Sequence, residues 1–187
     1  MQQLLRIIEP PRQCSYLPHE LASLEYRIIS RLTAAEHGHL LARGYRRFGS
    51  QFFRPSCAGC AACRSVRIVV PSFVPSASQR RVLRRNEDLR AELHPLFAGP
   101  EILSLYNRYH RFMHGHRGWP LEAPITLRSY QQSFLGGPSH LGRQWLYFLG
   151  ETLVGVAFMD EVPEAISLVY AFYDPEFETD RSAHIRS

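Results

Sequence analysis

The sequence contains no lysine, and all 22 of its basic residues are arginine. This absence excludes enzymes that depend on a lysine nucleophile, a Schiff-base lysine or a Walker A lysine. The chain also lacks a run of about 18 apolar residues that could span a membrane, and residues 1–11 lack the apolar core and cleavage site of a signal peptide. We therefore expect a soluble, cytosolic protein without a membrane partner.

The remaining composition is that of an ordinary globular protein. Apolar residues make up 45% of the 187 residues, and charged residues make up 21%. A chain of this length can bury a hydrophobic core, either as one domain or as two small ones.

Arginine is concentrated in one part of the chain. Residues 43–91 contain 11 arginines against two acidic residues, a net charge of +9, whereas the remainder has 11 arginines against 15 acidic residues, a net charge of −4. Guanidinium groups bind phosphate through two hydrogen bonds at once, so the backbone of RNA or DNA is the expected partner. The alternative is a solvated helix face. The candidate binding residues are Arg46, Arg47, Arg80, Arg81, Arg84 and Arg85.

The four cysteines are Cys14, Cys57, Cys60 and Cys63, and the last three form a C-x-x-C-x-x-C run. In a reducing cytosol this spacing favours a metal site over disulfides, and it suits both a zinc ion and an iron-sulfur cluster. If Cys14 is the fourth ligand, the metal holds the N-terminal segment against the later loop, which is a structural role. The alternative is a buried thiol at Cys14 and a tight loop of small residues.

Local signals predict three helices. A Thr33 to Glu36 capping box and Gly44 predict a helix over residues 33–43. Ser76 or Ser78 can cap a second helix over residues 79–92, which would pack its leucines inward and turn its arginines outward. The third helix covers residues 101–114. Two of its histidines, at 110 and 114, could ligate a metal, although no Glu follows the first as in H-E-x-x-H.

Strand composition appears on both sides of the cysteine run and again near the end of the chain. Phe48, Phe52 and Phe53 precede the cysteines and residues 66–70 follow them, so the metal would lie at a strand junction. Residues 145–149, 152–159 and 166–173 predict an antiparallel meander with turns between them. This order fits an α+β acyltransferase domain, and the same pattern also suits many binding modules.

Motifs in a fixed order resemble the aminoacyl-tRNA protein transferases. The similarity runs from Cys14 to Pro175, and it is closer to the bacterial aspartate/glutamate leucyltransferases than to the eukaryotic arginyltransferases. The motifs are Cys14-x-Tyr16-Leu17-Pro18, Arg43-Gly44-Tyr45-Arg46-Arg47-x-Gly49, Phe53-Arg54-Pro55-x-Cys57-x-x-Cys60-x-x-Cys63, Arg67-Ile68-x-Val70, Ser76-x-Ser78-Gln79-Arg80-Arg81-x-x-Arg84-Arg85-Asn86-x-Asp88-Leu89, Asp160 and Ser167-x-Val169-Tyr170-x-Phe172-Tyr173-Asp174-Pro175.

The resemblance implies a fold and a function. The fold is a cysteine-rich N-terminal domain, residues 1–72, followed by an acetyltransferase-like (GNAT) domain, residues 73–187. The function is transfer of leucine from leucyl-tRNA to proteins that begin with Asp or Glu, which marks them for degradation in the N-end rule pathway. The partners are then leucyl-tRNA and the acceptor proteins, and DNA is not expected.

The resemblance also suggests roles for single residues. An acidic acceptor side chain needs arginine, so Arg46, Arg47, Arg80 and Arg81 are candidates to bind that carboxylate or the tRNA phosphates. Tyr170 and Asp174 are candidates to orient the acceptor amine or accept its proton, although structural roles are common for an aromatic residue and for an Asp before proline.

The end of the chain departs from the family pattern. After Pro175 the family continues with an Arg-Ser-Leu-Gly-like stretch, a helix and strands, whereas this sequence reads D-R-S-A-H-I-R-S from Asp180. The resemblance therefore implies a GNAT domain without its C-terminal part, with an unpaired sheet edge. Our hypothesis is a truncated or frameshifted form with weak or no transferase activity.

Two other functions are compatible with the residues. The cysteine run and the arginines suit a non-catalytic, metal-stapled RNA-binding module equally well. A CoA-dependent acetyltransferase would need a glycine-rich pyrophosphate loop at a helix start, and none follows the strand that ends near residue 173, so CoA is not an expected cofactor.

Overall fold

The computed structural model describes residues 1–177, which divide into two compact units. Each unit is assembled from segments that are distant in the sequence. Unit 1 comprises Met1–Arg67, Gln131–Gly142 and Asp160–Val169, and unit 2 comprises Ile68–Tyr130, Arg143–Met159 and the described part of Tyr170–Ser187. The expected domain boundary after residue 72 stays a prediction.

Unit 1 contains a four-stranded antiparallel sheet with the order β1-β4-β6-β5. Its strands are β1 (Gln2–Ile8), β4 (Leu24–Arg31), β5 (Arg46–Phe48) and β6 (Gln51–Pro55), and a separate ribbon pairs β2 (Arg12–Gln13) with β3 (Leu21–Ala22). The phenylalanine-rich strands expected before the cysteines are therefore confirmed. The core of the unit consists of Ile29, Leu32, Leu40, Tyr45 and Phe52.

Helix α1 (Ala34–Ala42) follows β4 and confirms the helix expected over residues 33–43. Thr33 Oγ1 accepts a hydrogen bond from the Glu36 amide, and the Glu36 side chain accepts one from the Thr33 amide, which forms the capping box. The chain leaves the helix through Gly44, whose φ of 81° lies in the left-handed region. Leu40 is buried, so the helix covers the core with its expected apolar side.

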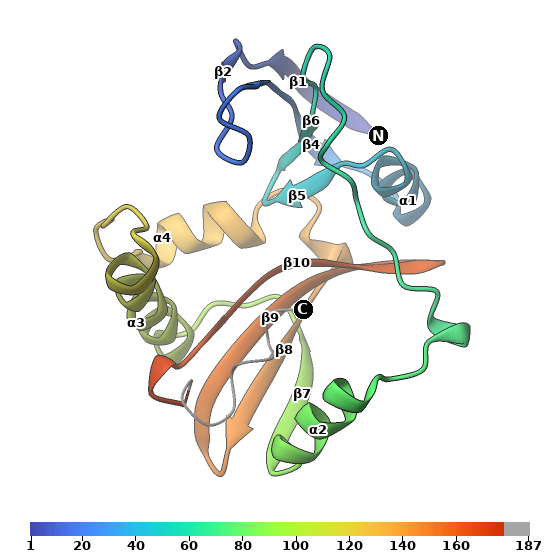
Figure 1. Cartoon of the computed structure of the whole chain (residues 1–187). Coiled ribbons are helices and arrows are strands. Elements are labelled where there is room, and N and C mark those ends of the chain that lie inside the picture. The colour runs from blue at the N-terminus through green and yellow to red at the C-terminus, as the bar shows by residue number, and fades with distance from the viewer. Residues whose placement is uncertain (178–187) are drawn as a thin grey trace. The chain divides into compact units, whose positions relative to one another are not determined.

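A second four-stranded sheet has the order β10-β9-β8-β7 (Figure 1). Its strands are β7 (Leu89–Pro95), β8 (Gly142–Leu149), β9 (Thr152–Val162) and β10 (Ala165–Tyr173), and β7 pairs antiparallel with β8. The expected strands and turns of the meander are confirmed. The hairpin end of β9 and β10, Asp160–Val169, belongs to unit 1.

Helix α3 (Pro100–Arg117) confirms the third expected helix and extends it by one turn. Its buried positions are spaced as on one helix face, and the helix ends at Gly118 with a φ of 68°. The buried residues are Ile102, Leu105, Tyr109 and Met113. Shorter helical segments are η1 (Val70–Ser72), α4 (Leu127–Tyr130), η2 (Gln131–Leu135), η3 (Ser139–Leu141) and η4 (Pro175–Phe177).

Two predicted elements were wrong. Residues 66–70 form no strand: they are an exposed extended segment that ends in the short helix η1. Strand β6 already has β4 on one side and β5 on the other, so the segment after the cysteines finds no free edge there, and strand composition alone does not form a strand.

The second helix was placed correctly at its start but not at its end. Helix α2 (Ala77–Arg85) begins at Ser76, whose side chain and Gln79 form a capping box. It stops at Asn86, because Leu89 and Leu93 belong to β7 and pair with β8. No residue of α2 is buried, and Leu83 is 64% exposed, so the expected inward-facing leucine side is absent.

The fold class is thus mixed α and β with antiparallel sheets. Within residues 1–177 no helix combines the length and the apolar character needed to cross a bilayer. Asp180 and the residues after it, where the sequence departs from the family pattern, lie outside the described residues.

Candidate functional site

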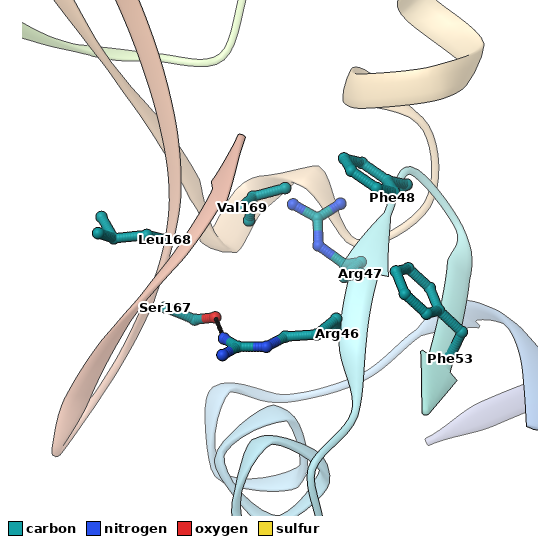
Figure 2. Close-up of a pocket in the computed structure, with 7 residues that line it drawn as sticks. All are labelled: Arg46, Arg47, Phe48, Phe53, Ser167, Leu168 and Val169. Atoms are coloured by element: carbon teal, nitrogen blue, oxygen red, sulfur yellow. Dashed lines mark hydrogen bonds between the residues drawn. The ribbon is translucent and has the colours of Figure 1, made fainter. Parts of the chain in front are cut away.

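A pocket of about 260 Å³ lies within unit 1. Strand β5 contributes Arg46, Arg47 and Phe48, β6 contributes Phe53, and β10 contributes residues 167–169. The Arg46 side chain extends from β5 to Ser167 of β10 (Figure 2), and Arg47 lines the same pocket. The structure therefore brings together two of the six arginines that the sequence nominated.

Arg47 lies in a buried ion pair. Its Nε donates to Asp160 Oδ2 over 2.9 Å, its Nη2 donates to Asp160 Oδ1, and its Nη1 donates to the Gly49 carbonyl over 2.9 Å. The two residues are 4% and 1% exposed. The charge of Arg47 is neutralised inside the protein, so this arginine is held in place and cannot reach a tRNA phosphate in this conformation. The assignment of Arg47 to the acceptor carboxylate or to tRNA phosphates stays a prediction, and its buried ion pair favours a structural role.

His37 borders this ion pair and is fully buried. Its Nε2 lies 3.5 Å from Asp160 Oδ2, and neither ring nitrogen has a hydrogen-bond partner in the described part of the chain. Burial lowers the pKa of His37, and although Asp160 opposes this shift, Arg47 and His140 reinforce it. His37 is therefore neutral at pH 7, and it adds no charge to the pair.

Arg46 differs from its neighbour because it is exposed and carries an unneutralised charge. Its Nη1 donates to Ser167 Oγ over 3.1 Å (Figure 2), and it makes no ion pair within residues 1–177. Phe48 and Phe53 stack with their ring centroids 5.8 Å apart and form an apolar wall. The pocket thus presents one free guanidinium group beside aromatic and aliphatic side chains.

A second arginine cluster surrounds Glu25, which is 1% exposed. This carboxylate accepts hydrogen bonds from Tyr45 Oη over 2.7 Å and from the guanidinium groups of Arg6, Arg27 and Arg54 at 2.8–3.2 Å. Burial would raise the pKa of Glu25, but these hydrogen bonds outweigh burial and lower it. Glu25 therefore stays ionised and ties three strands and the Tyr45 side chain together.

Helix α2 presents its arginines in the opposite way. Its four arginines are all exposed, and none of them makes an ion pair in the part of the chain that the structure describes. Within each pair, Arg80 with Arg84 and Arg81 with Arg85, the two like charges lie four residues apart on the helix and repel each other. An anion that bridges them would relieve this repulsion, so the helix is suited to phosphate.

The nominated residues Tyr170 and Asp174 have separate partners in unit 2. Tyr170 Oη lies 3.0 Å from His110 Nε2, and the His110 ring stacks on Tyr106 with centroids 4.0 Å apart. Burial raises the pKa of Tyr170 and lowers the pKa of His110. The phenol therefore keeps its proton, and the neutral imidazole can accept a hydrogen bond from it.

Asp174 is buried and already bonded. Its Oδ2 accepts a hydrogen bond from Arg108 Nη2 over 2.6 Å, and its Oδ1 accepts one from the Glu176 amide over 3.2 Å. These bonds organise the turn after β10, which favours a structural role for Asp174.

The four cysteines lie in unit 1 as free thiols; Cys63 is exposed and the other three are partly buried. Cys57 Sγ lies 3.6 Å from the Ser23 carbonyl, and Cys14 Sγ accepts the Tyr16 amide at 3.5 Å. Among residues 1–177 no three or more His, Cys, Asp or Glu side chains are grouped so that they could hold a metal ion. In this conformation the four thiols do not form a closed ligand set.

Sequence reasoning did not recognise three residues as partners: Asp160 entered only as part of a motif, His110 only as a possible metal ligand, and Glu25 not at all. Asp160 is an acidic residue within the apolar strand β9, and an acid in such a strand signals a buried charge partner. That signal was available. Glu25 and His110 carry no such sign, because one lies in an alternating strand and the other on the polar side of a helix with several histidines.

Two family models match parts of this chain. Residues 12–81 match the family "Arginine-tRNA-protein transferase, N terminus", and residues 101–183 match "Arginine-tRNA-protein transferase, C terminus".

Individual proteins are similar over most of the chain, and each of the following three is named aspartate/glutamate leucyltransferase. The protein from Helicobacter hepaticus is 34% identical over 175 residues, which are 94% of this chain and 72% of that protein. The one from Thiobacillus denitrificans is 37% identical over 89% of this chain and 68% of its own length. The one from Aeromonas salmonicida is 36% identical over 94% and 71%.

Proposed function

Because the chain belongs to the arginine-tRNA-protein transferase family, we propose that it transfers leucine from leucyl-tRNA to the α-amine of proteins that begin with Asp or Glu. The names of its relatives supply the donor amino acid and the acceptor class. The product, a protein with an N-terminal leucine, would enter the N-end rule pathway of degradation, which is the general role of the family. Aminoacyl-tRNA is used in the cytosol, so we place the reaction there.

The observation that carries this proposal is the free positive charge of helix α2. Its four guanidinium groups project from nine residues without an acidic partner in residues 1–177, and guanidinium groups bind phosphate through paired hydrogen bonds. The affinity of such contacts comes from the phosphate backbone and is independent of sequence. We assign α2 to the tRNA backbone, with Arg80, Arg81, Arg84 and Arg85 as its contacts.

Leucyl transfer requires only two contributions from the protein. The aminoacyl ester of the donor is already activated, and the acceptor α-amine has a pKa of roughly 8, so the enzyme must align two substrates and remove one proton. The amine nitrogen attacks the ester carbonyl, the new amide bond forms, and the bond to the ribose oxygen breaks as that oxygen takes a proton. No covalent intermediate is required.

We propose that His110 and Tyr170 remove the proton from the acceptor amine. The neutral His110 ring can accept it, either directly or through the Tyr170 hydroxyl 3.0 Å away. Arg108 and Asp174 then act as support, because their ion pair holds the turn that follows Tyr170 and its strand.

Two finer expectations remain proposals. One is that the helix-and-meander part of the chain is acetyltransferase-like and that the N-terminal part is a cysteine-rich domain; the order of α3 and the strands β8 to β10 supports the first half. The other is zinc or an iron-sulfur cluster at Cys14, Cys57, Cys60 and Cys63, supported by their spacing alone.

The decisive experiment is a transfer assay with radiolabelled leucyl-tRNA and peptides that begin with Asp, Glu or Ala. We expect label on the two acidic peptides and none on the Ala peptide. A parallel reaction with arginyl-tRNA tests the donor. If the chain binds tRNA but labels no peptide, the proposed function is wrong and a non-catalytic RNA-binding module takes its place.

A further inference from the structure

We propose that the pocket between Arg46, Phe53 and Ser167 binds the carboxylate side chain of the acceptor's first residue, with Arg46 as the group that recognises it. This inference rests on the proposed function for the identity of the acceptor. It assigns the recognition of that acceptor to a single guanidinium group.

The charges in the pocket select Arg46 over Arg47. Arg47 has its counter-ion, since Asp160 holds it through two hydrogen bonds in a buried site. Arg46 has only a neutral partner, the Ser167 hydroxyl, and no acid within residues 1–177 pairs with it. A ligand that enters the pocket therefore meets one uncompensated positive charge, and a carboxylate is its natural partner.

The Arg46 guanidinium is held ready for this contact. Ser167 is only 8% exposed, so packing fixes the position of its hydroxyl group. This hydroxyl accepts a hydrogen bond from Arg46 Nη1 and thereby holds the guanidinium group in place. The other N–H groups of the guanidinium remain for a ligand, because Arg46 makes no second hydrogen bond within the described residues. Preorganisation of this kind lowers the entropy lost on binding.

The size and the walls of the pocket suit one amino-acid side chain. Its volume of about 260 Å³ lies below the roughly 300–1,000 Å³ of pockets that enclose drug-sized ligands. Phe48, Phe53 and Val169 form walls of low polarity, in which a carboxylate and a guanidinium attract each other more strongly than in open water. The Arg46 guanidinium repels a basic first side chain. Asn and Gln have the shape of Asp and Glu but carry no charge, so they lose the electrostatic attraction to Arg46.

The test compares Arg46→Gln with the unchanged chain on peptides that differ only at the first residue, Asp against Asn. In the unchanged chain we expect kcat/KM for leucyl transfer to be higher for Asp. In Arg46→Gln the value for Asp should fall by about tenfold to a hundredfold, the size expected when a charged hydrogen bond is removed, and the value for Asn should hardly change. Arg46→Glu should favour peptides that begin with Arg.

Arg31→Gln is the matched control, since Arg31 is an exposed arginine of the same unit and lies outside the pocket. It should keep the Asp preference of the unchanged chain. If Arg46→Gln instead weakens transfer equally for Asp and Asn and raises the KM for leucyl-tRNA, Arg46 contacts tRNA and the inference is overturned.

Calorimetric binding of the same peptides without tRNA separates this inference from the proposed function. If the Asp peptide binds more tightly than the Asn peptide, and Arg46→Gln abolishes that difference, the pocket is supported even when no leucine is transferred. Equal binding of both peptides by the unchanged chain rejects the pocket even if transfer occurs.

Discussion

The arginines around Glu25 and those on helix α2 have the same chemistry and opposite surroundings. Arg6, Arg27 and Arg54 share one buried carboxylate, so each guanidinium group is bonded within the protein. The four arginines of α2 are exposed and make no ion pair in residues 1–177. The first group contributes to folding, whereas the second is free to bind an outside anion.

Net charge does not reveal this difference. Both groups add to the same excess of arginine. However, only a charge without a counter-ion attracts a polyanion at distances up to about the Debye length. The pocket repeats the contrast in two adjacent residues, because Arg47 is neutralised by Asp160 and Arg46 is not. Changes at the neutralised arginines or their carboxylates should therefore alter stability, whereas changes at the arginines without a counter-ion should alter binding.

The largest loss of stability is expected from Asp160→Ala. It leaves Arg47 as a buried charge without a counter-ion, which should lower the free energy of unfolding by about 3–5 kcal/mol in urea denaturation. The control Glu164→Ala removes an exposed carboxylate from the nearby turn and should change stability by less than about 0.5 kcal/mol. Equal effects of both changes would show that the buried pair is unimportant.

A smaller loss is expected from Glu25→Gln. The amide keeps the shape of the side chain but removes the charge that three arginines share, so the free energy of unfolding should fall by about 2–3 kcal/mol. Glu20→Gln, at an exposed carboxylate of the same unit, is the control. Unchanged stability in Glu25→Gln would mean that the arginines are satisfied by water.

The same carboxylate predicts a pH dependence. The pKa of Glu25 in the folded state is lowered below its ordinary value of 4.5, so its contribution to stability is complete above that pH and is lost as the pH falls below it. Urea midpoints measured from pH 6 downward should therefore fall more steeply for the unchanged chain than for Glu25→Gln. Parallel curves would contradict the lowered pKa.

The smallest change in stability is expected from the double variant Arg84→Gln and Arg85→Gln. Because both side chains are exposed without an ion pair in the described part, the free energy of unfolding should change by less than about 0.5 kcal/mol. Binding of tRNA should weaken, and the slope of log K against log salt should become shallower by about 0.7–0.9 for each tRNA phosphate that the variant no longer neutralises.

The matched control for α2 removes two exposed arginines from α3, Arg111→Gln and Arg117→Gln. This variant should bind tRNA with nearly the salt slope of the unchanged chain. If both double variants make the salt slope shallower by the same amount, tRNA binding depends on the total charge of the protein and α2 is not its specific binding site.

Sequence reasoning succeeded where the signal was local. The capping boxes at Thr33 and Ser76 predicted the starts of α1 and α2, because the cap and its partner are three residues apart. The end of α2 was misplaced, since Leu89 and Leu93 suit a helix side and a strand equally, and pairing with β8 decides for the strand. The strand predicted over residues 66–70 was wrong for the same reason: strand β6 has neighbours on both sides, so these residues have no strand edge there to pair with.

The amino-acid sequence by itself determined the family, the absence of lysine chemistry, the excess of arginine and most of the helices and strands. All of these depend on residue identity and on short-range spacing. Only the tertiary structure decided which arginines are neutralised, because Arg47 and Asp160 are 113 residues apart and Glu25 meets arginines from three different strands. Charge compensation depends on distance in space, and the order of residues along the chain does not specify that distance.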